Sequence, residues 1–314
     1  MLKTAFGLIT AGVGGLYTVL LDEACDGMET VACRAKGAFR HAEQKPLVGD
    51  RVEVRYDDAN PAETAVIREI LARKNALIRP PMANVTHLFA AVAAARPAPS
   101  LETLDKLTAI ATHNSIDLTF VITKSDLDKE NTKRLADLYR LSGFSVFETG
   151  LDEKEADDLI KEKIDSLPEG SIVAFAGASG VGKSTLLNRL FPHLCLHTGE
   201  VSQKIMRGKH TTRRVDLFCA ENKDGKPFFL ADTPGFSLLD FTAFDFFALE
   251  DLFDSFPDFA PYAGLCRYND CTHTGEGPDE CAIAKAVREE KVASSRQESY
   301  RTLYRILKEK KNKF

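Results

Sequence analysis

The first 75 residues combine short apolar runs with closely spaced glycines. Leu, Val, Thr and Tyr are frequent in these runs, and such residues favour β-strands. Gly12, Gly27 and Gly49 separate the runs, as residues of turns do. Four strands are predicted, at residues 8–10, 16–20, 30–34 and 51–56. Several short strands at this spacing indicate a small β-barrel.

From Val85 onward, apolar strands alternate with amphipathic helices. The predicted strands are 87–94, 118–122, 145–149 and 172–176, and the predicted helices are 101–113, 129–141 and 154–164. Strands that alternate with helices indicate a parallel sheet with helical crossovers. Two further strands, 214–220 and 227–231, are joined by the turn Asn222–Gly225, which predicts a hairpin.

The last part of the chain is predicted to be mainly helical. One helix begins at Ala282, and another runs from Tyr300 to Phe314. The second helix ends in a basic run from Lys308 to Lys313. Such a run can be solvated, or it can contact RNA.

Composition and charge limit the possible functions. The 314 residues are 44% hydrophobic and 28% charged, as in folded proteins, and the formal net charge is −5. The chain as a whole is therefore not a basic nucleic-acid binder, and RNA contact requires local patches. Glycines interrupt the apolar N-terminus, which lacks a signal-peptide cleavage pattern and a membrane span. We expect a monomeric, cytoplasmic protein with no membrane partner.

Among small barrels, the oligonucleotide-binding (OB) class matches the N-terminal pattern best. One predicted loop of this barrel is basic and carries Lys36, Arg40, His41 and Lys45. Barrels of this class often bind nucleic acid, so the loop is a candidate for RNA contact. The alternative is an ordinary solvated loop.

A phosphate-binding loop pattern follows the strand 172–176: two glycines around four residues, then Lys and a hydroxyl. Glycines let backbone N–H groups converge on anionic oxygens, and the positive end of the next helix favours the same anion. Lys183 would reach the terminal phosphates, and Ser184 would bind Mg²⁺. The alternative is a glycine-rich turn without a ligand. The predicted nucleotide-binding residues here are Gly177, Ala178, Ser179, Gly180, Val181, Gly182, Lys183, Ser184 and Thr185.

The strand that ends at Ile122 leads into Thr123, Lys124, Ser125 and Asp126. Thr-Lys-x-Asp is typical of guanine recognition. The aspartate accepts hydrogen bonds from guanine N1–H and the exocyclic amine, and adenine would leave this carboxylate unsatisfied. Lys124 would lie over the base plane. The alternative is a helix cap. Thr149-Gly150, at the end of the next strand, is a candidate loop for backbone contact with the base.

Residues 191–214 show little periodicity and have the character of a switch loop. Either Thr211 or Thr212 would bind Mg²⁺ there, and we select Thr212. Further on, Asp232-Thr-Pro-Gly235 follows an apolar strand, which predicts that Asp232 holds the Mg²⁺ water shell and that Gly235 contacts the γ-phosphate. Phe236 stands where a Gln often orients the attacking water. His210 is the candidate catalytic residue, although a loop histidine can also be merely exposed.

Four metal-ligand types lie within sixteen residues near the C-terminus. They follow the pattern Cys-x4-Cys-x-His-x7-Cys, which suits one tetrahedral, structural zinc ion with no open position. A segment this small buries little core, so the metal would supply folding energy. The alternative is a set of reduced cysteines around a loop. The predicted ligands are Cys266, Cys271, His273 and Cys281.

The guanine motif precedes the phosphate loop, whereas in ordinary GTPases it follows, and a circular permutation explains this order. The motifs together resemble the bacterial family of GTPases that depend on the small ribosomal subunit. Thr198–Glu200 and Gly208–Thr212 add to the resemblance, and Arg213 departs from it, because many members have a third Thr there. The resemblance implies a late factor in small-subunit maturation whose GTPase is stimulated by that subunit.

We therefore predict three domains: an OB barrel that binds RNA or the ribosome (1–78), a circularly permuted α/β P-loop GTPase domain (79–240) and a helical zinc-binding domain (241–314). The expected cofactors are GTP/GDP, Mg²⁺ and one Zn²⁺, and the expected partners are the small ribosomal subunit and its rRNA. The chain leaving Gly235 runs directly into the zinc domain, so a γ-phosphate-dependent shift could reorient that domain. Two alternatives are a small-metabolite P-loop kinase and an RNA-binding protein with a vestigial nucleotide domain.

Overall fold

The structure is a computed structural model. It describes residues 2–25, 28–35, 39, 45–57, 59–151, 154–192, 215–232 and 239–312. The chain folds into two compact units, which are described separately below. The first unit draws on residues 1–86, 167–174 and 197–235, and the second on residues 87–166, 175–196 and 236–314. The boundaries 78/79 and 240/241 of the three predicted domains stay predictions.

The first unit contains a closed five-stranded barrel. Its strands are β1 (Leu2–Val13), β2 (Leu16–Cys25), β3 (Met28–Ala35), β4 (Arg51–Asp57) and β5 (Val66–Ile70), with the short helix α1 (Pro61–Thr64) before β5. They pair in the order β1-β2-β3-β5-β4, and β4 pairs again with β1. The predicted barrel is thus observed, and its five strands support the OB class. The fifth strand was not predicted.

Alternating side chains fill the barrel. In β4 the positions Val52, Val54 and Tyr56 are buried, whereas the residues between them are more exposed. This period of two is what a strand with one buried face requires. The chain that leaves β5 remains attached to the barrel, because Arg73 Nε lies 2.7 Å from Oδ1 of the fully buried Asp50.

The first unit also holds two small hairpins and the start of a longer strand. β6 (Ala76–Leu77) pairs with β7 (Met82–Ala83), and β12 (Asp216–Glu221) pairs with β13 (Pro227–Asp232). The second hairpin is the one predicted from its turn. β13 runs parallel to the first three residues of β11 (Ile172–Ala176), and β12 contacts β1 at Ala11.

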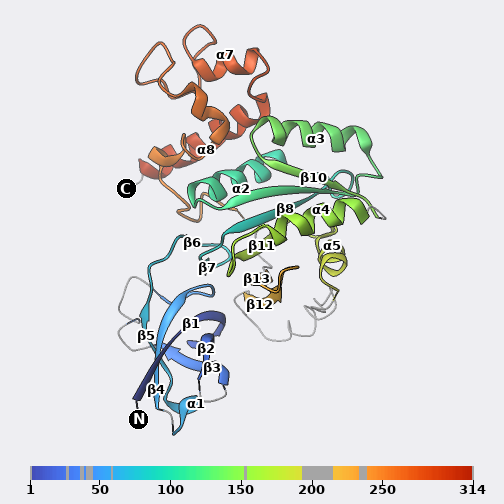
Figure 1. Cartoon of the computed structure of the whole chain (residues 1–314). Helices are drawn as coiled ribbons and strands as arrows, with labels where there is room; N and C mark the ends of the chain where they lie inside the picture. Colours follow the sequence, from blue (N-terminus) through green and yellow to red (C-terminus); the bar gives the residue numbers. More distant parts are fainter. Residues whose placement is uncertain are drawn as a thin grey trace. The chain divides into compact units, whose positions relative to one another are not determined.

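The second unit contains the predicted parallel strands and their crossover helices (Figure 1). β8 (His87–Ala93), β9 (Asp117–Thr123) and β10 (Ser145–Thr149) lie side by side, with β9 in the centre. In register, Thr123 is opposite Ala93 on one side and Thr149 on the other. The carboxyl ends of the three strands therefore reach one edge, where ligands bind in sheets of this kind. The helices are α2 (Leu101–His113), α3 (Lys129–Leu141) and α4 (Lys154–Asp165).

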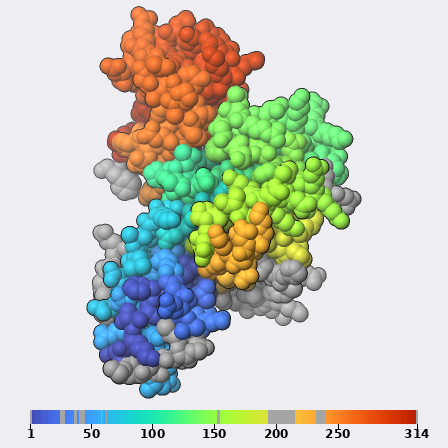
Figure 2. Space-filling view, in the orientation of Figure 1, coloured from blue at the N-terminus to red at the C-terminus, as the bar shows by residue number. Residues whose placement is uncertain are grey.

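The C-terminal module, residues 241–312, belongs to the second unit. It comprises the 3-10 helices η3 (Leu249–Asp251) and η4 (Pro257–Tyr262) and the α-helices α7 (Ala282–Arg288) and α8 (Ser294–Lys311). α8 begins six residues before the predicted Tyr300. α8 packs against α2, and in Figure 2 the orange-to-red atoms of this module lie against blue-green and green atoms of the second unit. Among the described residues, no helix has the length and apolar character needed to cross a bilayer.

Two lysines of the basic run at the end of α8 bind acidic side chains of the same module. Lys310 Nζ donates to Asp245 Oδ1 (2.6 Å) and to the Phe244 carbonyl (3.0 Å), and Lys311 Nζ donates to Glu250. These contacts fasten the end of α8. They also reduce the positive charge that the run presents to any RNA.

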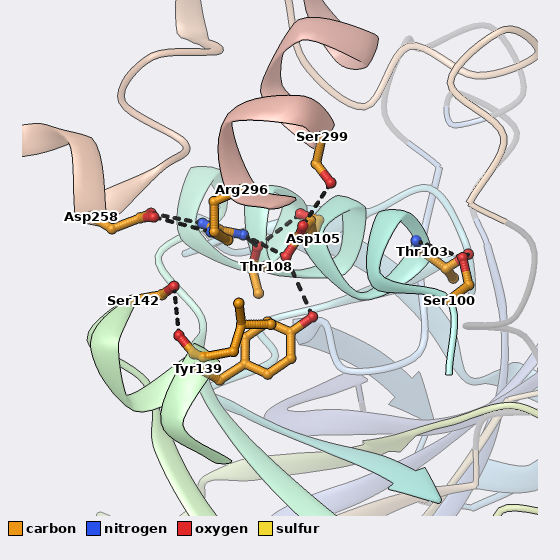
Figure 3. A network of polar contacts seen from close by, with 10 residues as sticks. Ser100, Thr103, Asp105, Thr108, Tyr139, Ser142, Asp258, Arg296 and Ser299 are labelled. Atoms are coloured by element: carbon orange, nitrogen blue, oxygen red, sulfur yellow. Dashed lines mark hydrogen bonds and ion pairs between the residues drawn. The ribbon is translucent and has the colours of Figure 1, made fainter. Parts of the chain in front are cut away.

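A buried arginine attaches α8 to α2 (Figure 3). Nη1 of Arg296, which is 0% exposed, donates to Asp105 Oδ1 (2.9 Å) and to the Thr108 hydroxyl (2.7 Å). Its Nη2 donates to Asp258 Oδ1 (2.8 Å), and the Ser299 hydroxyl donates to Asp105 Oδ2 (2.6 Å). Burial raises the pKa of Asp105, and Arg296 opposes that rise. The network thus holds one buried cation between two buried carboxylates.

Candidate nucleotide site and metal centre

The phosphate-loop pattern lies between the end of β11 and α5 (Lys183–Leu190). Gly182 is the N-cap of α5 and has φ +94°, a left-handed conformation that favours glycine. A Cβ at Gly177 would lie 2.7 Å from the Ala91 carbonyl oxygen, so only glycine allows the loop to pass this close to β8. The loop therefore has the strand, turn and helix that phosphate binding requires.

Most residues of the phosphate loop are exposed or partly exposed, and Val181 is buried. Val181 is buried and fixes the loop to the unit, whereas Lys183 is partly exposed. The remaining candidates for phosphate and Mg²⁺ contact are accessible to a ligand from solvent. The exposed residues of the loop are Ala178, Ser179, Gly180, Ser184 and Thr185.

The guanine motif touches the phosphate loop directly. The Thr123 hydroxyl donates to the Val181 carbonyl (2.5 Å). Lys124 has φ +57°, and its Nζ donates to the Gly180 carbonyl (2.8 Å) and to the Arg96 carbonyl. Motifs that lie more than fifty residues apart in the sequence are thus joined at one edge of the second unit.

Asp126 lies beside the loop that follows β10. A Cβ added to Gly150 would be 2.9 Å from Asp126 Oδ1, so the backbone of residue 150 lies alongside this carboxylate. The Ser125 amide donates to the Thr149 carbonyl (3.3 Å), which holds the two loops together. Asp126 is exposed and Ser125 is buried, so the carboxylate is accessible to a ligand and the serine supports the turn.

A cavity of about 200 Å³ adjoins the phosphate loop on the side of α2. Its lining is mainly apolar and includes Val92, Leu104 and Val181, together with Ser100 and Thr103. None of these described lining residues is cationic, so charged phosphates would lose hydration there without gaining a compensating charge, and this cavity is not the predicted phosphate site.

Several predicted site residues lie outside the described part of the chain. They are His210, Thr212 and Gly235; of Asp232, only the backbone is described, as the last residue of β13. Their predicted contacts with Mg²⁺, the γ-phosphate and the attacking water stay predictions. The RNA contact of Lys36, Arg40 and His41, which also lie outside the described residues, stays a prediction as well.

The four predicted metal ligands come together in the C-terminal module. Their ligand atoms all lie within 4.8 Å of one another. His273 Nδ1 is 3.5 Å from the sulfur of each of Cys266, Cys271 and Cys281. Zinc–sulfur bonds of about 2.3 Å and a zinc–nitrogen bond of about 2.0 Å in a tetrahedron require a sulfur–nitrogen separation of roughly 3.5 Å. The geometry therefore fits a tetrahedral ion.

Backbone amides and one carboxylate support this cluster. The Ala282 amide points at Cys266 Sγ (3.3 Å) and the Ala284 amide at Cys281 Sγ (3.5 Å), which would stabilise metal-bound thiolates. Glu276 accepts from the Thr272 amide (2.9 Å) and the Gly275 amide (3.1 Å). Burial alone would raise the pKa of Glu276, but these hydrogen bonds lower it to about 2. The donors and their supports suit a structural zinc site.

Comparison with known proteins identifies the family. The model of the RsgA GTPase family matches residues 70–242, and that of the RsgA N-terminal domain matches residues 6–63. The chain belongs to the RsgA GTPase family. Relatives named small ribosomal subunit biogenesis GTPase RsgA are 37% identical. One, from Alkaliphilus metalliredigens, aligns over 94% of both chains, and another, from Clostridium perfringens, over 98% of this chain and 99% of its own.

Two solved structures match almost the whole chain. The crystal structure of YjeQ from Thermotoga maritima is 30% identical, with a TM-score of 0.75 over 97% of this chain and 99% of that one. The crystal structure of YloQ, described as a circularly permuted GTPase, is 31% identical, with a TM-score of 0.72 over 98% and 96%. The predicted permuted GTPase fold and the family resemblance are thereby confirmed.

One residue of this RsgA GTPase domain escaped the sequence analysis. Arg189, in the last turn of α5, contacts Gly150, Leu151 and Asp157. Its partners lie 32 to 40 residues away in the sequence, so no local pattern signals these contacts.

Proposed function

We propose that this chain binds GTP·Mg²⁺ at the edge formed by the phosphate loop, the guanine motif and the loop after β10, and hydrolyses it to GDP and phosphate. The observation that carries this proposal is the direct contact between the two motifs, from Thr123 to Val181 and from Lys124 to Gly180. A kinase for a small metabolite would share the phosphate loop, but it would have no use for a guanine motif joined to it.

The predicted roles follow from the chemistry of each group. Backbone N–H groups of residues 177–183 surround the phosphates, and Lys183 neutralises the terminal ones. Ser184 and Thr212 coordinate Mg²⁺, Asp232 holds its water shell, and Gly235 donates to the γ-phosphate. Phosphoryl transfer depends mostly on positioning and charge stabilisation, which these groups supply.

The base is read by Asp126, whose carboxylate accepts from guanine N1–H and the 2-amino group. Lys124, whose ammonium bridges Gly180 and Arg96, lies with its aliphatic part across the base plane. Thr123 and Ser125 hold this turn against the phosphate loop and the end of β10. Base and phosphate recognition therefore share one support.

Catalysis on the isolated chain is slow, because Phe236 stands where a water-orienting Gln is common. His210, or a group from a partner, orients the attacking water. His210→Ala should therefore lower partner-stimulated single-turnover hydrolysis far more than GTP affinity. Parental stimulated rates in this variant would assign the role to another group.

We further propose that the reaction serves biogenesis of the small ribosomal subunit. The names of the relatives support this, and so does the combination of a five-stranded barrel with a Cys/His module. One Zn²⁺, held by Cys266, Cys271, His273 and Cys281, stabilises the C-terminal module, and the barrel contacts rRNA. The chain acts as a monomer on the particle.

GTP turnover with and without purified small ribosomal subunits tests the function. We expect little turnover by the chain alone and a large increase with subunits, which is abolished in Lys183→Ala. Nucleotide binding without any hydrolysis in either condition would favour the vestigial RNA-binding alternative. Consumption of GTP that depends on a metabolite and releases no phosphate would favour the kinase.

A further inference from the structure

Arg189 connects three segments of the second unit. Its Nη1 donates to the carbonyls of Gly150 and Leu151, both at 2.8 Å. Its Nη2 donates to the Thr149 hydroxyl (3.0 Å) and to Asp157 Oδ1 (2.9 Å), and its Nε lies 2.9 Å from Asp157 Oδ2. One guanidinium thus joins the phosphate-loop helix α5 to the loop after β10 and to α4.

We propose that Arg189 is a positioning residue for base selectivity: it fixes the Gly150–Leu151 backbone, from the phosphate-loop helix, beside Asp126. The proposal rests on the proposed function, because only a guanine nucleotide at this edge gives the loop a ligand to select.

The orientation of the peptide groups explains how Arg189 acts on a base that it does not touch. In a trans peptide the C=O and the following N–H point in opposite directions. A Gly150 carbonyl held towards Arg189 therefore directs the Leu151 N–H away from it. This N–H becomes a donor with a fixed direction on the side of the loop away from α5.

The position of Asp126 makes that donor useful for selectivity. The backbone at Gly150 runs beside the Asp126 carboxylate, where a Cβ would come within 2.9 Å of Oδ1. A donor beside a carboxylate complements guanine, which presents the O6 acceptor next to the N1–H and 2-amino donors. Adenine presents an amino donor in place of O6, so a rigid N–H there disfavours it.

Asp157 keeps the guanidinium in this orientation. Its Oδ1 accepts a hydrogen bond from Arg189 Nη2, and its Oδ2 lies 2.9 Å from Arg189 Nε as an ion-pair contact. The pair is sheltered, with the Asp157 side chain 12% exposed and the Arg189 side chain 26% exposed. Because one carboxylate contacts two nitrogens of the guanidinium, it restricts the rotation of the guanidinium as well as its position. Lysine has no fork of donors, so it could not bind Asp157 and both carbonyls in this plane.

A nearby ion pair provides a matched control. Arg140 on α3 contacts Glu148 on β10 (2.9 Å), and these side chains are 48% and 36% exposed. Arg140→Ala therefore removes an arginine–carboxylate pair at β10, the strand that leads into the loop, without changing a contact of Gly150 or Leu151. An exposed pair of this kind contributes little.

The test measures dissociation constants of the full chain for GDP, IDP and ADP. IDP keeps O6 and N1–H but lacks the 2-amino group, so it separates O6 recognition from contact with Asp126. For Arg189→Ala and Arg189→Lys we expect about tenfold weaker binding of GDP and of IDP, the loss of roughly one hydrogen bond, with ADP affinity unchanged. The GDP-to-IDP ratio should stay parental, and Arg140→Ala should leave all three constants unchanged.

Asp157→Asn should weaken the binding of GDP and IDP by a smaller factor. This variant can replace Arg189→Ala in the test if Arg189→Ala folds poorly. A parental GDP-to-ADP ratio in folded Arg189→Lys would overturn the proposal, as would an equal loss for all three nucleotides, which indicates a structural role only. Asp126→Asn tests the guanine site separately from the role of Arg189. A gain in xanthosine diphosphate binding by this variant would support the guanine site even if the Arg189 variants overturn the proposal. No gain would refute the guanine site itself.

Discussion

The C-terminal module and the nucleotide edge of the second unit use polar side chains in opposite ways. In the module they point inward: Arg296 is 0% exposed, and Cys281 is buried at the metal cluster. At the nucleotide edge, Asp126 and Ser184 are exposed, and the supporting Arg189 is only partly sheltered. Arg296 is paired with carboxylates of the protein itself, whereas the exposed groups at the nucleotide edge retain capacity for a ligand. Changes in the module should therefore alter stability, and changes at the edge should alter affinity.

Metal removal should have the largest effect of the changes considered, and this effect should be on the stability of the C-terminal module. Zinc contributes about 10–16 kcal/mol to the folding of small zinc-finger peptides, so Cys281→Ser or a strong chelator should unfold the C-terminal module. Metal analysis and limited proteolysis of residues 241–314 measure this, and GDP affinity should change little. Cys219→Ser, at an exposed cysteine of β12, is the control. Folded, reduced protein without bound metal would refute the site.

Asp126→Asn should give the largest effect at the nucleotide edge. An amide in place of the carboxylate accepts poorly from guanine and donates to the 2-oxo group of xanthine. We expect the GTP-to-XTP preference to fall by on the order of 10³-fold, with a stability change within about 0.5 kcal/mol. Competition binding measures the nucleotide preference, and urea unfolding measures the stability. Asp137→Asn, on the exposed face of α3, should change neither. A parental preference for GTP would contradict the assignment.

Arg296→Ala should lower stability without changing nucleotide affinity. It leaves Asp105 and Asp258 buried without their cation, and breaking a buried pair in this way costs about 3–5 kcal/mol. Urea unfolding measures the loss, and Arg305→Ala, at an exposed position on the same helix, is the matched control. A loss below that of an ordinary surface substitution would mean that water reaches the site.

Replacing the whole network sharpens this test. Arg296→Met with Asp105→Leu and Asp258→Leu removes all three charges together. Well-packed apolar replacements for buried ion pairs are often neutral or stabilising, so the triple variant should recover much of the stability lost by Arg296→Ala. Recovery would show that the single variant is destabilised mainly by unpaired carboxylates.

Protonation of His87 should have the smallest effect on stability. This histidine shows what burial alone, without an ion pair, does to a titratable group. Burial, with a smaller contribution from Lys163, lowers its pKa from the ordinary 6.5 to about 4. A lowered histidine pKa means that stability is fully present above pH 6.5 and is lost as the pH falls towards 4. At pH 5 the loss from this residue should be about 2 kcal/mol. Urea unfolding at pH 7.5 and 5 should show a weaker pH dependence in His87→Gln, and an unchanged dependence would exclude His87 as the cause.

Several features were determined by sequence alone because their causes are local. The bounds of α2 and α3 agree with prediction, since Ser100 and Asp128 cap the helices from the adjacent positions. The four side chains of the Cys/His cluster lie within sixteen residues, so their spacing predicted that they come together. The phosphate loop and Thr123–Asp126 carry their chemistry in consecutive residues, and the family followed from their order.

Other features required the tertiary structure because their partners are distant in the chain. β5 becomes a strand by closing the barrel between β3 and β4, and its own residues gave too weak a pattern. Lys310 and Lys311 contact Asp245 and Glu250, which lie more than sixty residues earlier in the chain, so the local sequence gives no sign of these pairs. Arg296 reaches Asp105 across 191 residues, and Arg189 reaches Gly150 across 39. A buried or shared charge is stabilised by whatever surrounds it in space, and only the folded chain decides which residues those are.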